Sequence, residues 1–128
     1  MAKPTVAILG ASSDRAKFGN KSLRAHLHGG YEVYPVNPKA DRIEGLASYA
    51  SLVAVPANQL DRISVYLPPA VGLRVLPEIA ATQAREVWFN PGSATPELLE
   101  RARALGVNAI AGCSIVDLGL SPSDFPDN

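Results

Sequence analysis

This chain has very little cysteine, and its sequence lacks the segments that direct a protein out of the cytoplasm. Cys113 is the single cysteine among 128 residues, so an internal disulfide and a metal site built from several cysteines are both excluded. No apolar run approaches the ~20 residues of a membrane-spanning helix, and the first residues do not have the pattern of a secretory leader. We therefore expect a cytoplasmic protein with no membrane partner.

The chain also lacks an excess of either charge. Its 12 lysines and arginines balance its 12 aspartates and glutamates. A protein that binds nucleic acid through its overall field has a basic excess, so we expect no nucleic-acid partner, and any anion site must be local. A length of 128 residues suits one domain and leaves no room for a separate catalytic domain, so residues 1–128 are assigned to a single domain.

Segments typical of strands alternate with segments typical of helices. We expect strands at residues 6–9, 31–36, 63–67, 86–90 and 107–112, and helices at 22–28, 48–53, 70–82 and 96–105. The alternation predicts an α/β fold, namely a Rossmann-like, doubly wound, parallel five-stranded sheet with helices on both faces. Pro77 should kink its helix or restart it, because proline removes one helical hydrogen bond.

The helix at 96–105 has the clearest ends in the sequence. Thr95 is a typical N-cap residue, Pro96 suits the first helical position, and Gly106 follows the last turn. Its buried face would consist of Leu98, Leu99, Ala102 and Leu105. After Leu120 the chain is rich in proline and aspartate, and we expect a tail there or a loop that packs against a partner.

The segment from Val6 to Asn20 has the pattern of a phosphate-binding loop. A continuous apolar run suits a strand buried on both faces, and it ends at Gly10, where the backbone can turn sharply and approach a ligand. The backbone N–H groups at the start of the following helix can point at an anion. Hydroxyl donors would come from Ser12 and Ser13, and positive charge from Arg15, Lys17 and Lys21.

The same segment departs from the dinucleotide fingerprint G-x-G-x-x-G. Ser12 stands where the second glycine would be. The alternative interpretation is an ordinary strand-to-helix turn, in which the glycine and its small neighbours serve geometry alone.

A second candidate segment, Asn37-Pro38-Lys39, follows the second expected strand. An NAD-binding domain usually has an acidic residue here, which holds the ribose hydroxyls, whereas this chain has Asn37 and then Lys39. A lysine suits a phosphate on the ribose, as in NADP or coenzyme A, and a solvated loop lysine is the alternative. Because the carboxyl ends of parallel strands share one edge of the sheet, both segments should lie close together.

Several segments together resemble the stand-alone coenzyme A-binding domain family, which is similar to the N-terminal CoA-binding domain of the succinyl-CoA synthetase α subunit. The matching features are Gly10-Ala11-Ser12, the stretch from Gly30 to Pro38, Ile43-Glu44-Gly45, Leu67-Pro68-Pro69, Trp88 and Cys113. They cover nearly the whole chain, and the Tyr-Pro-Val-Asn-Pro stretch is the most specific.

The resemblance implies a role for each matching loop. The CoA pyrophosphate would lie on Gly10, Ala11, Ser12 and Ser13, the phosphorylated ribose beside Asn37, Pro38 and Lys39, and the adenosine beside Leu67 and Pro68. Lys17 is a further phosphate partner by charge and position. On the pantetheine side, the resemblance implies Asn90, Gly92 and Cys113.

Two departures limit what the resemblance implies. Many stand-alone members have an Arg-Arg or Arg-Pro pair where this chain has Leu67-Pro68-Pro69, and relatives often have glutamine near the position of Asn90. The synthetase also has its phosphorylated histidine in a later domain, which this chain does not contain. Its ligase chemistry therefore does not transfer.

No combination of residues in the sequence predicts catalysis or a metal site. His26 and His28 are two apart on an expected helix and face different directions, so we expect solvated or capping histidines rather than ligands. Cys113, Ser12 and Ser13 have no recognisable base nearby, which favours a plain buried thiol at Cys113.

We therefore favour a non-catalytic protein that binds CoA or acyl-CoA, as a carrier, a sensor or the partner of an acyl-transfer enzyme. The alternative is an enzyme, either an NADP-binding oxidoreductase component or one part of a split acyl-CoA synthetase. A homodimer is the working expectation for the oligomeric state.

Overall fold

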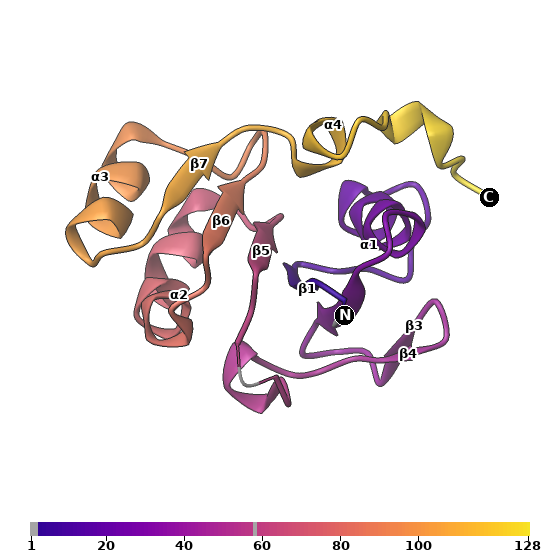
Figure 1. The fold of residues 1–128 in the computed structure, drawn as a ribbon, viewed down its shortest axis with the longest axis horizontal. Coiled ribbons are helices and arrows are strands. Elements are labelled where there is room, and N and C mark those ends of the chain that lie inside the picture. The colour runs from indigo at the N-terminus through magenta and orange to yellow at the C-terminus, as the bar shows by residue number, and fades with distance from the viewer. Residues whose placement is uncertain (1–2, 58) are drawn as a thin grey trace.

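Five parallel strands form the centre of the molecule in the computed structural model, which describes residues 3–57 and 59–128 (Figure 1). The strands are β1 (Thr5–Leu9), β2 (Glu32–Val36), β5 (Arg62–Val65), β6 (Glu86–Phe89) and β7 (Ala109–Ala111). Their order across the sheet is β2-β1-β5-β6-β7. The five-stranded parallel sheet confirms the predicted fold class. The chain builds outward from β1 in one direction and then returns to add β5 on its other side, so β1 and β5 flank a topological switch point.

Helices cover both faces of this sheet, as the doubly wound prediction requires (Figure 1). One face packs against α1 (Phe18–His28) and the short α4 (Ser114–Asp117), and the other against α2 (Pro69–Thr82) and α3 (Pro96–Ala104). Successive residues of β1 divide between the two layers, because side chains alternate along a strand. Val6 and Ile8 join Leu23 of α1, whereas Ala7 and Leu9 join the core that α2 and α3 cover.

Between β2 and β5 the structure differs from the prediction of a helix at 48–53. The segment instead forms a hairpin of β3 (Arg42–Ile43) and β4 (Leu46–Ala47), followed by the single 3-10 turn η1 (Leu52–Ala54). The hairpin turns at Glu44 and Gly45, which have φ of +50° and +78°. After this turn the Tyr49 backbone N–H donates to the Pro35 carbonyl oxygen, and the Tyr49 carbonyl oxygen accepts from the Asn37 N–H, both at 2.9 Å. This bridge to β2 holds residue 49 in an extended conformation, which prevents a helix from starting at 48.

Two helix predictions also need correction, and a third is narrowed. α1 begins at Phe18, four residues before the predicted start. α2 continues through Pro77 as one helix, which excludes the predicted restart and leaves the kink as a prediction. Leu105, expected on the buried face of α3, is 53% exposed because it is the C-cap residue, past the last helical turn. The predicted N-cap is correct, since Thr95 accepts a hydrogen bond from the Leu98 backbone N–H.

The C-terminal residues pack on the chain's own α1. After α4 and a second 3-10 turn, η2 (Pro122–Asp124), the Lys21 ammonium donates to the Phe125 carbonyl oxygen at 2.8 Å. The Arg24 guanidinium lies over the Phe125 ring, 5.8 Å from its centroid. These contacts replace the predicted free tail or partner-packed loop. Within the described part of the chain, no helix combines the length and the apolar character needed to cross a membrane.

Candidate functional site

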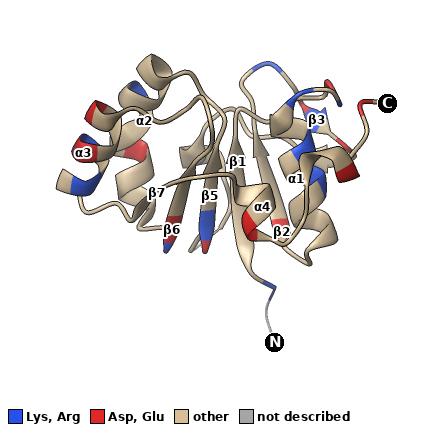
Figure 2. Ribbon diagram, turned by 90° about the horizontal axis from the view of Figure 1, so that it is seen from above, with Lys and Arg blue, Asp and Glu red and all other residues tan. Residues whose placement is uncertain are grey.

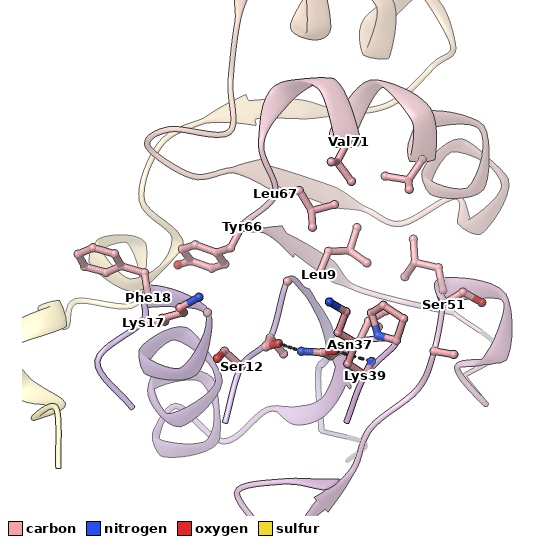
Figure 3. A pocket seen from close by; sticks show the side chains of 18 of the residues that line it. Leu9, Ser12, Lys17, Phe18, Asn37, Lys39, Ser51, Tyr66, Leu67 and Val71 are labelled. Atoms are coloured by element: carbon pink, nitrogen blue, oxygen red, sulfur yellow. Dashed lines mark hydrogen bonds between the residues drawn. The ribbon is translucent and has the colours of Figure 1, made fainter. Parts of the chain in front are cut away.

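A cavity of about 840 Å³ opens at the carboxyl ends of β1, β2 and β5, at the switch point of the sheet (Figure 3). Strand ends contribute Leu9 and Val36, and the residues after β5 contribute Tyr66 and Leu67. This volume lies within the range of roughly 300–1,000 Å³ that is usual for ligand pockets. Parallel α/β sheets bind their ligands at this place, because the connecting loops there diverge to opposite faces.

The loop after β1 forms one wall of the cavity. Gly10 has φ of +84°, and a Cβ added to it would lie 2.3 Å from the Tyr66 carbonyl oxygen. Gly19, in the first turn of α1, approaches the loop equally closely, since its Cβ would lie 2.3 Å from the Gly10 carbonyl oxygen. Both glycines are therefore required for the loop to pass between β5 and α1. In the fingerprint G-x-G-x-x-G, the last glycine allows the helix to pack closely against the strand. Gly19 has the corresponding role here, because it allows α1 to pack closely against the loop.

Two asparagine side chains hold the loop carbonyl groups. Asn20 Nδ2 donates to the Ser12 carbonyl oxygen at 2.9 Å, and Asn37 Nδ2 donates to the Ala11 carbonyl oxygen at 2.8 Å. Asn37 Oδ1 also accepts from the Lys39 backbone N–H at 2.7 Å, so that one side chain joins the two predicted anion-binding segments (Figure 3). The two segments meet at one wall, as their position after neighbouring strands predicted.

Two lysines line the cavity, and the other predicted cations do not. Lys17 and Lys39 are both exposed, and neither forms a salt bridge with residues 3–57 or 59–128. Arg15 instead pairs with Glu44 at 3.4 Å, and Lys21 is held by the C-terminal residues. The positive charge available to a ligand therefore comes from Lys17 on the helix side and Lys39 on the β2 side.

The opposite half of the cavity is apolar. It lies between η1 and α2 and is lined by Leu9, Val36, Leu52, Leu67, Val71 and Val75, with Ser51 and Glu78 as its polar members. A slot of this kind suits a flat, largely apolar ring. The sequence did not reveal this slot, because a helix was expected at 48–53 where the structure has η1.

Some predicted site residues lie outside the cavity lining. Ser13 and Pro68 are exposed beside it, and Gly92 is exposed in the turn after β6. Asn90 is fully buried: its amide donates to Ser64 Oγ at 3.0 Å, and its Oδ1 accepts from the Ser114 backbone N–H at 2.8 Å. Asn90 thus joins β5 and β6 to the start of α4, and its hydrogen-bonding groups are occupied.

Cys113 also lies outside the cavity lining, as the half-buried N-cap residue of α4. Tyr66, which the sequence reasoning did not single out, lines the cavity instead. Its phenol oxygen lies 3.4 Å from Ser114 Oγ, and burial raises the pKa of this phenol. The Tyr66 phenol is therefore neutral near neutral pH, and its hydroxyl contacts Ser114 at the start of α4.

His26 corrects the expectation of a solvated or capping histidine. The ring is fully buried, with Nδ1 2.8 Å from the Ser22 carbonyl oxygen and Nε2 3.5 Å from Arg62. Because a carbonyl only accepts and a guanidinium only donates, Nδ1 carries the proton and the ring is neutral. Burial lowers the pKa of His26 to about 4.

The groups around His26 belong to the far end of the sheet from the cavity. Arg62 begins β5 and pairs with Glu86 at 2.9 Å and Asp117 at 2.6 Å, among the charged amino ends of the strands in Figure 2. Its guanidinium lies 5.1 Å from the centroid of the Trp88 ring. The buried side chains of His26 and Arg62 therefore bond to each other and to charged neighbours, and neither lines the cavity.

Comparison with known proteins places this chain in a family. The family described as "CoA binding domain" matches residues 4–119. An ADP-forming acetate–CoA ligase from Methanocaldococcus jannaschii is 34% identical over 74 residues, which cover 58% of this chain and 10% of the ligase, so the similarity spans only a small part of that enzyme.

Two solved structures are similar in both sequence and fold. A conserved hypothetical protein from Pyrococcus furiosus is 36% identical with a TM-score of 0.79, over 91% of this chain and 99% of that one. A dinucleotide-forming acetyl-coenzyme A synthetase from Ca. Korarchaeum cryptofilum is 28% identical with a TM-score of 0.72, over 83% of this chain and 25% of the synthetase. By its sequence and its fold, this chain belongs to the CoA-binding domain family.

Proposed function

We propose that the cavity at the switch point binds coenzyme A, with the pyrophosphate on the Gly10–Ser13 loop and the ribose phosphate beside Lys39. The observation that carries this proposal is the position of Asn37, which bonds the loop at Ala11 O and the Lys39 backbone N–H together. One side chain thereby fixes two anion-binding segments relative to each other. The adenosine end of CoA has phosphate groups at two separate positions, and this pair of segments matches them.

The apolar slot supports the same orientation. A ribose beside Lys39 places the adenine between η1 and α2, where Leu52, Val71 and Val75 offer apolar surface. The pantetheine arm would leave the pyrophosphate on the other side, past Phe18 and Tyr66, which lie together at the far end of the cavity in Figure 3. The three parts of CoA thus each have a region of matching chemistry.

We propose a binding function without catalysis. Among the described residues that line the cavity there is no histidine or cysteine, and Ser12 Oγ already accepts the Asp14 backbone N–H at 3.0 Å. A nucleophile needs an adjacent base, and the Ser12 hydroxyl has no hydrogen bond to an acidic or basic side chain among the described residues. A carrier or sensor of CoA or acyl-CoA, or the partner of an acyl-transfer enzyme, fits such a site, and we keep a homodimer as the proposed assembly.

A second candidate function is one part of a split acyl-CoA synthetase. The observation that favours it is the similarity to the archaeal ligase and synthetase, in each of which this chain matches a minor part of the length. In that case the catalytic groups would come from another chain.

A thermal-shift panel tests the proposal. At equal concentrations, the ligand that binds most tightly stabilises the folded state most, and a ligand at 100 times its dissociation constant adds about 2.7 kcal/mol. CoA should therefore raise the melting temperature more than NADP or NAD does. A larger shift with NADP than with CoA would replace CoA binding by the dinucleotide alternative. No shift with any of the three ligands would contradict nucleotide binding at this cavity.

A further inference from the structure

The hairpin tip of β3 and β4 carries Glu44, whose side chain reaches the phosphate loop from outside the cavity. Glu44 Oε2 accepts from Asn20 Nδ2 at 3.1 Å and lies 3.4 Å from Arg15 Nε. Glu44 does not line the cavity, yet both of its partners belong to the loop or to the helix start that follows it. The side chain of Glu44 is 24% exposed, so water screens these contacts only in part.

The hairpin that presents Glu44 is fixed to the core. Ile43, the residue before it, is 1% exposed and packs in the cluster that contains Ala11 of the loop and Leu23 of α1. Arg42 closes the turn by donating to the Gly45 carbonyl oxygen at 3.0 Å. Glu44 therefore starts from a backbone position that is held against the same layer as the loop it contacts.

The contacts of Asn20 show what Glu44 does. Asn20 is fully buried, and its Nδ2 faces two acceptors, Glu44 and the Ser12 carbonyl oxygen at 2.9 Å. Its Oδ1 accepts from Arg24 Nε at 2.7 Å. The Glu44 carboxylate therefore favours the orientation of the Asn20 amide in which Nδ2 donates to the Ser12 carbonyl oxygen. A hydrogen bond to an ionised acceptor is stronger than one to a neutral acceptor.

A held Ser12 carbonyl matters for an anion because carbonyl oxygens repel phosphate, whereas backbone N–H groups attract it. The Ser12 carbonyl is bound to a side chain that lies outside the cavity lining. Arg15 Nε, in the same loop, lies 3.4 Å from the same carboxylate without forming a hydrogen bond to it. Loss of Glu44 would leave the Asn20 amide with the Ser12 carbonyl oxygen and Arg24 as its partners, and would weaken the hold on the loop between Ser12 and Lys17.

We infer that Glu44 is a positioning residue for the CoA pyrophosphate, acting through Asn20 on the Ser12 carbonyl. The inference rests on the proposed function. The inference gives a role to the Ile43-Glu44-Gly45 turn, which does not line the cavity. Glu44 would affect the loop that holds the pyrophosphate, and would not affect the apolar slot or Lys39.

Two substitutions separate this role from a structural one. Glu44→Gly removes the carboxylate, and glycine is favoured at φ of +50°, so the turn itself is preserved. Glu44→Gln keeps an acceptor oxygen for Asn20. Glu100→Ala, an exposed glutamate of α3, controls for the loss of one negative charge.

Calorimetric binding of CoA and of adenosine 3′-monophosphate, which has no pyrophosphate, distinguishes the outcomes. Glu44→Gly should weaken CoA about fivefold, and Glu44→Gln should weaken it less, because glutamine keeps an acceptor for Asn20 but loses the charge. Both variants should leave the monophosphate within twofold of its wild-type affinity, and Glu100→Ala should bind both ligands as the wild type does. An equal loss for both ligands, or unchanged CoA binding, would overturn the role of Glu44 and leave CoA binding intact. A wild-type protein that does not bind CoA would overturn the proposed function and this inference with it.

Discussion

Asn37 holds the carbonyl oxygen of Ala11 through its side-chain amide at 2.8 Å, across the gap between the loops that follow β2 and β1. The other end of the same side chain caps the Lys39 backbone N–H at 2.7 Å. This hydrogen-bonded bridge makes the two loops one wall of the cavity at the switch point, where we propose that the phosphates bind.

Asn37→Ala should therefore weaken CoA and dephospho-CoA alike, each by about tenfold, because a lost hydrogen bond that orders a charged site is worth about 1.4 kcal/mol. Titration calorimetry with both ligands measures this. Asn108→Ala is the matched control, since Asn108 is exposed and lies beside Arg85, away from the cavity. A loss confined to CoA would mean that Asn37 acts only through Lys39 and not on the pyrophosphate loop.

Gly10→Ala should destabilise the folded protein by at least about 2 kcal/mol, since the new Cβ combines an unfavourable positive φ with a contact of 2.3 Å to the Tyr66 carbonyl oxygen. Gly106→Ala is a matched control, because Gly106 has a similar φ of +83° and nothing within 4 Å of its added Cβ. The control should lose about 1 kcal/mol. Urea denaturation measures both. Equal losses would show that the close passage of the loop against β5 adds no cost.

His26 should make stability depend on pH. Its pKa is lowered by burial to about 4 in the folded protein, from an ordinary value of 6.5. Between these values the unfolded chain binds more protons than the folded one, so stability should rise as the pH rises from about 4 to 6.5, and the part due to His26 amounts to about 3 kcal/mol. Below about pH 4 this contribution is absent.

Urea denaturation at a series of pH values checks the His26 contribution. The wild type should gain stability between pH 5 and 6.5, and His26→Gln should lose most of that slope. His28→Gln, which alters an exposed histidine two residues away, should retain it. An unchanged slope in His26→Gln would place the pH dependence on other groups.

The sequence predicted the sheet well because each strand is marked by its own residues. Val6 to Leu9 is an unbroken apolar run, and Thr95 with Pro96 marks the start of α3 without reference to the rest of the chain. These strand and helix signals are local, so they do not depend on tertiary contacts. The meeting of the loops at one edge of the sheet was predicted from the parallel order of the strands.

The parts that the sequence did not predict depend on distant contacts. Lys21 and Arg15 look like phosphate ligands in the sequence, but the C-terminal residues and Glu44 occupy them in the fold. The position of His26 on its helix does not indicate its contact with Arg62, which lies 36 residues away in the sequence. One side of the apolar slot is formed by η1, and a 3-10 turn of three residues is too short to give a periodic pattern in the sequence.

The most direct test of the account compares CoA with dephospho-CoA on the wild type and on Lys39→Ala by titration calorimetry. The wild type should bind CoA about fivefold to tenfold more tightly than dephospho-CoA, as expected for a charge-assisted contact to the ribose phosphate. Lys39→Ala should remove that preference by weakening CoA alone. A preference that survives in Lys39→Ala, or equal affinities in the wild type, would contradict the placement of the ribose phosphate beside Lys39.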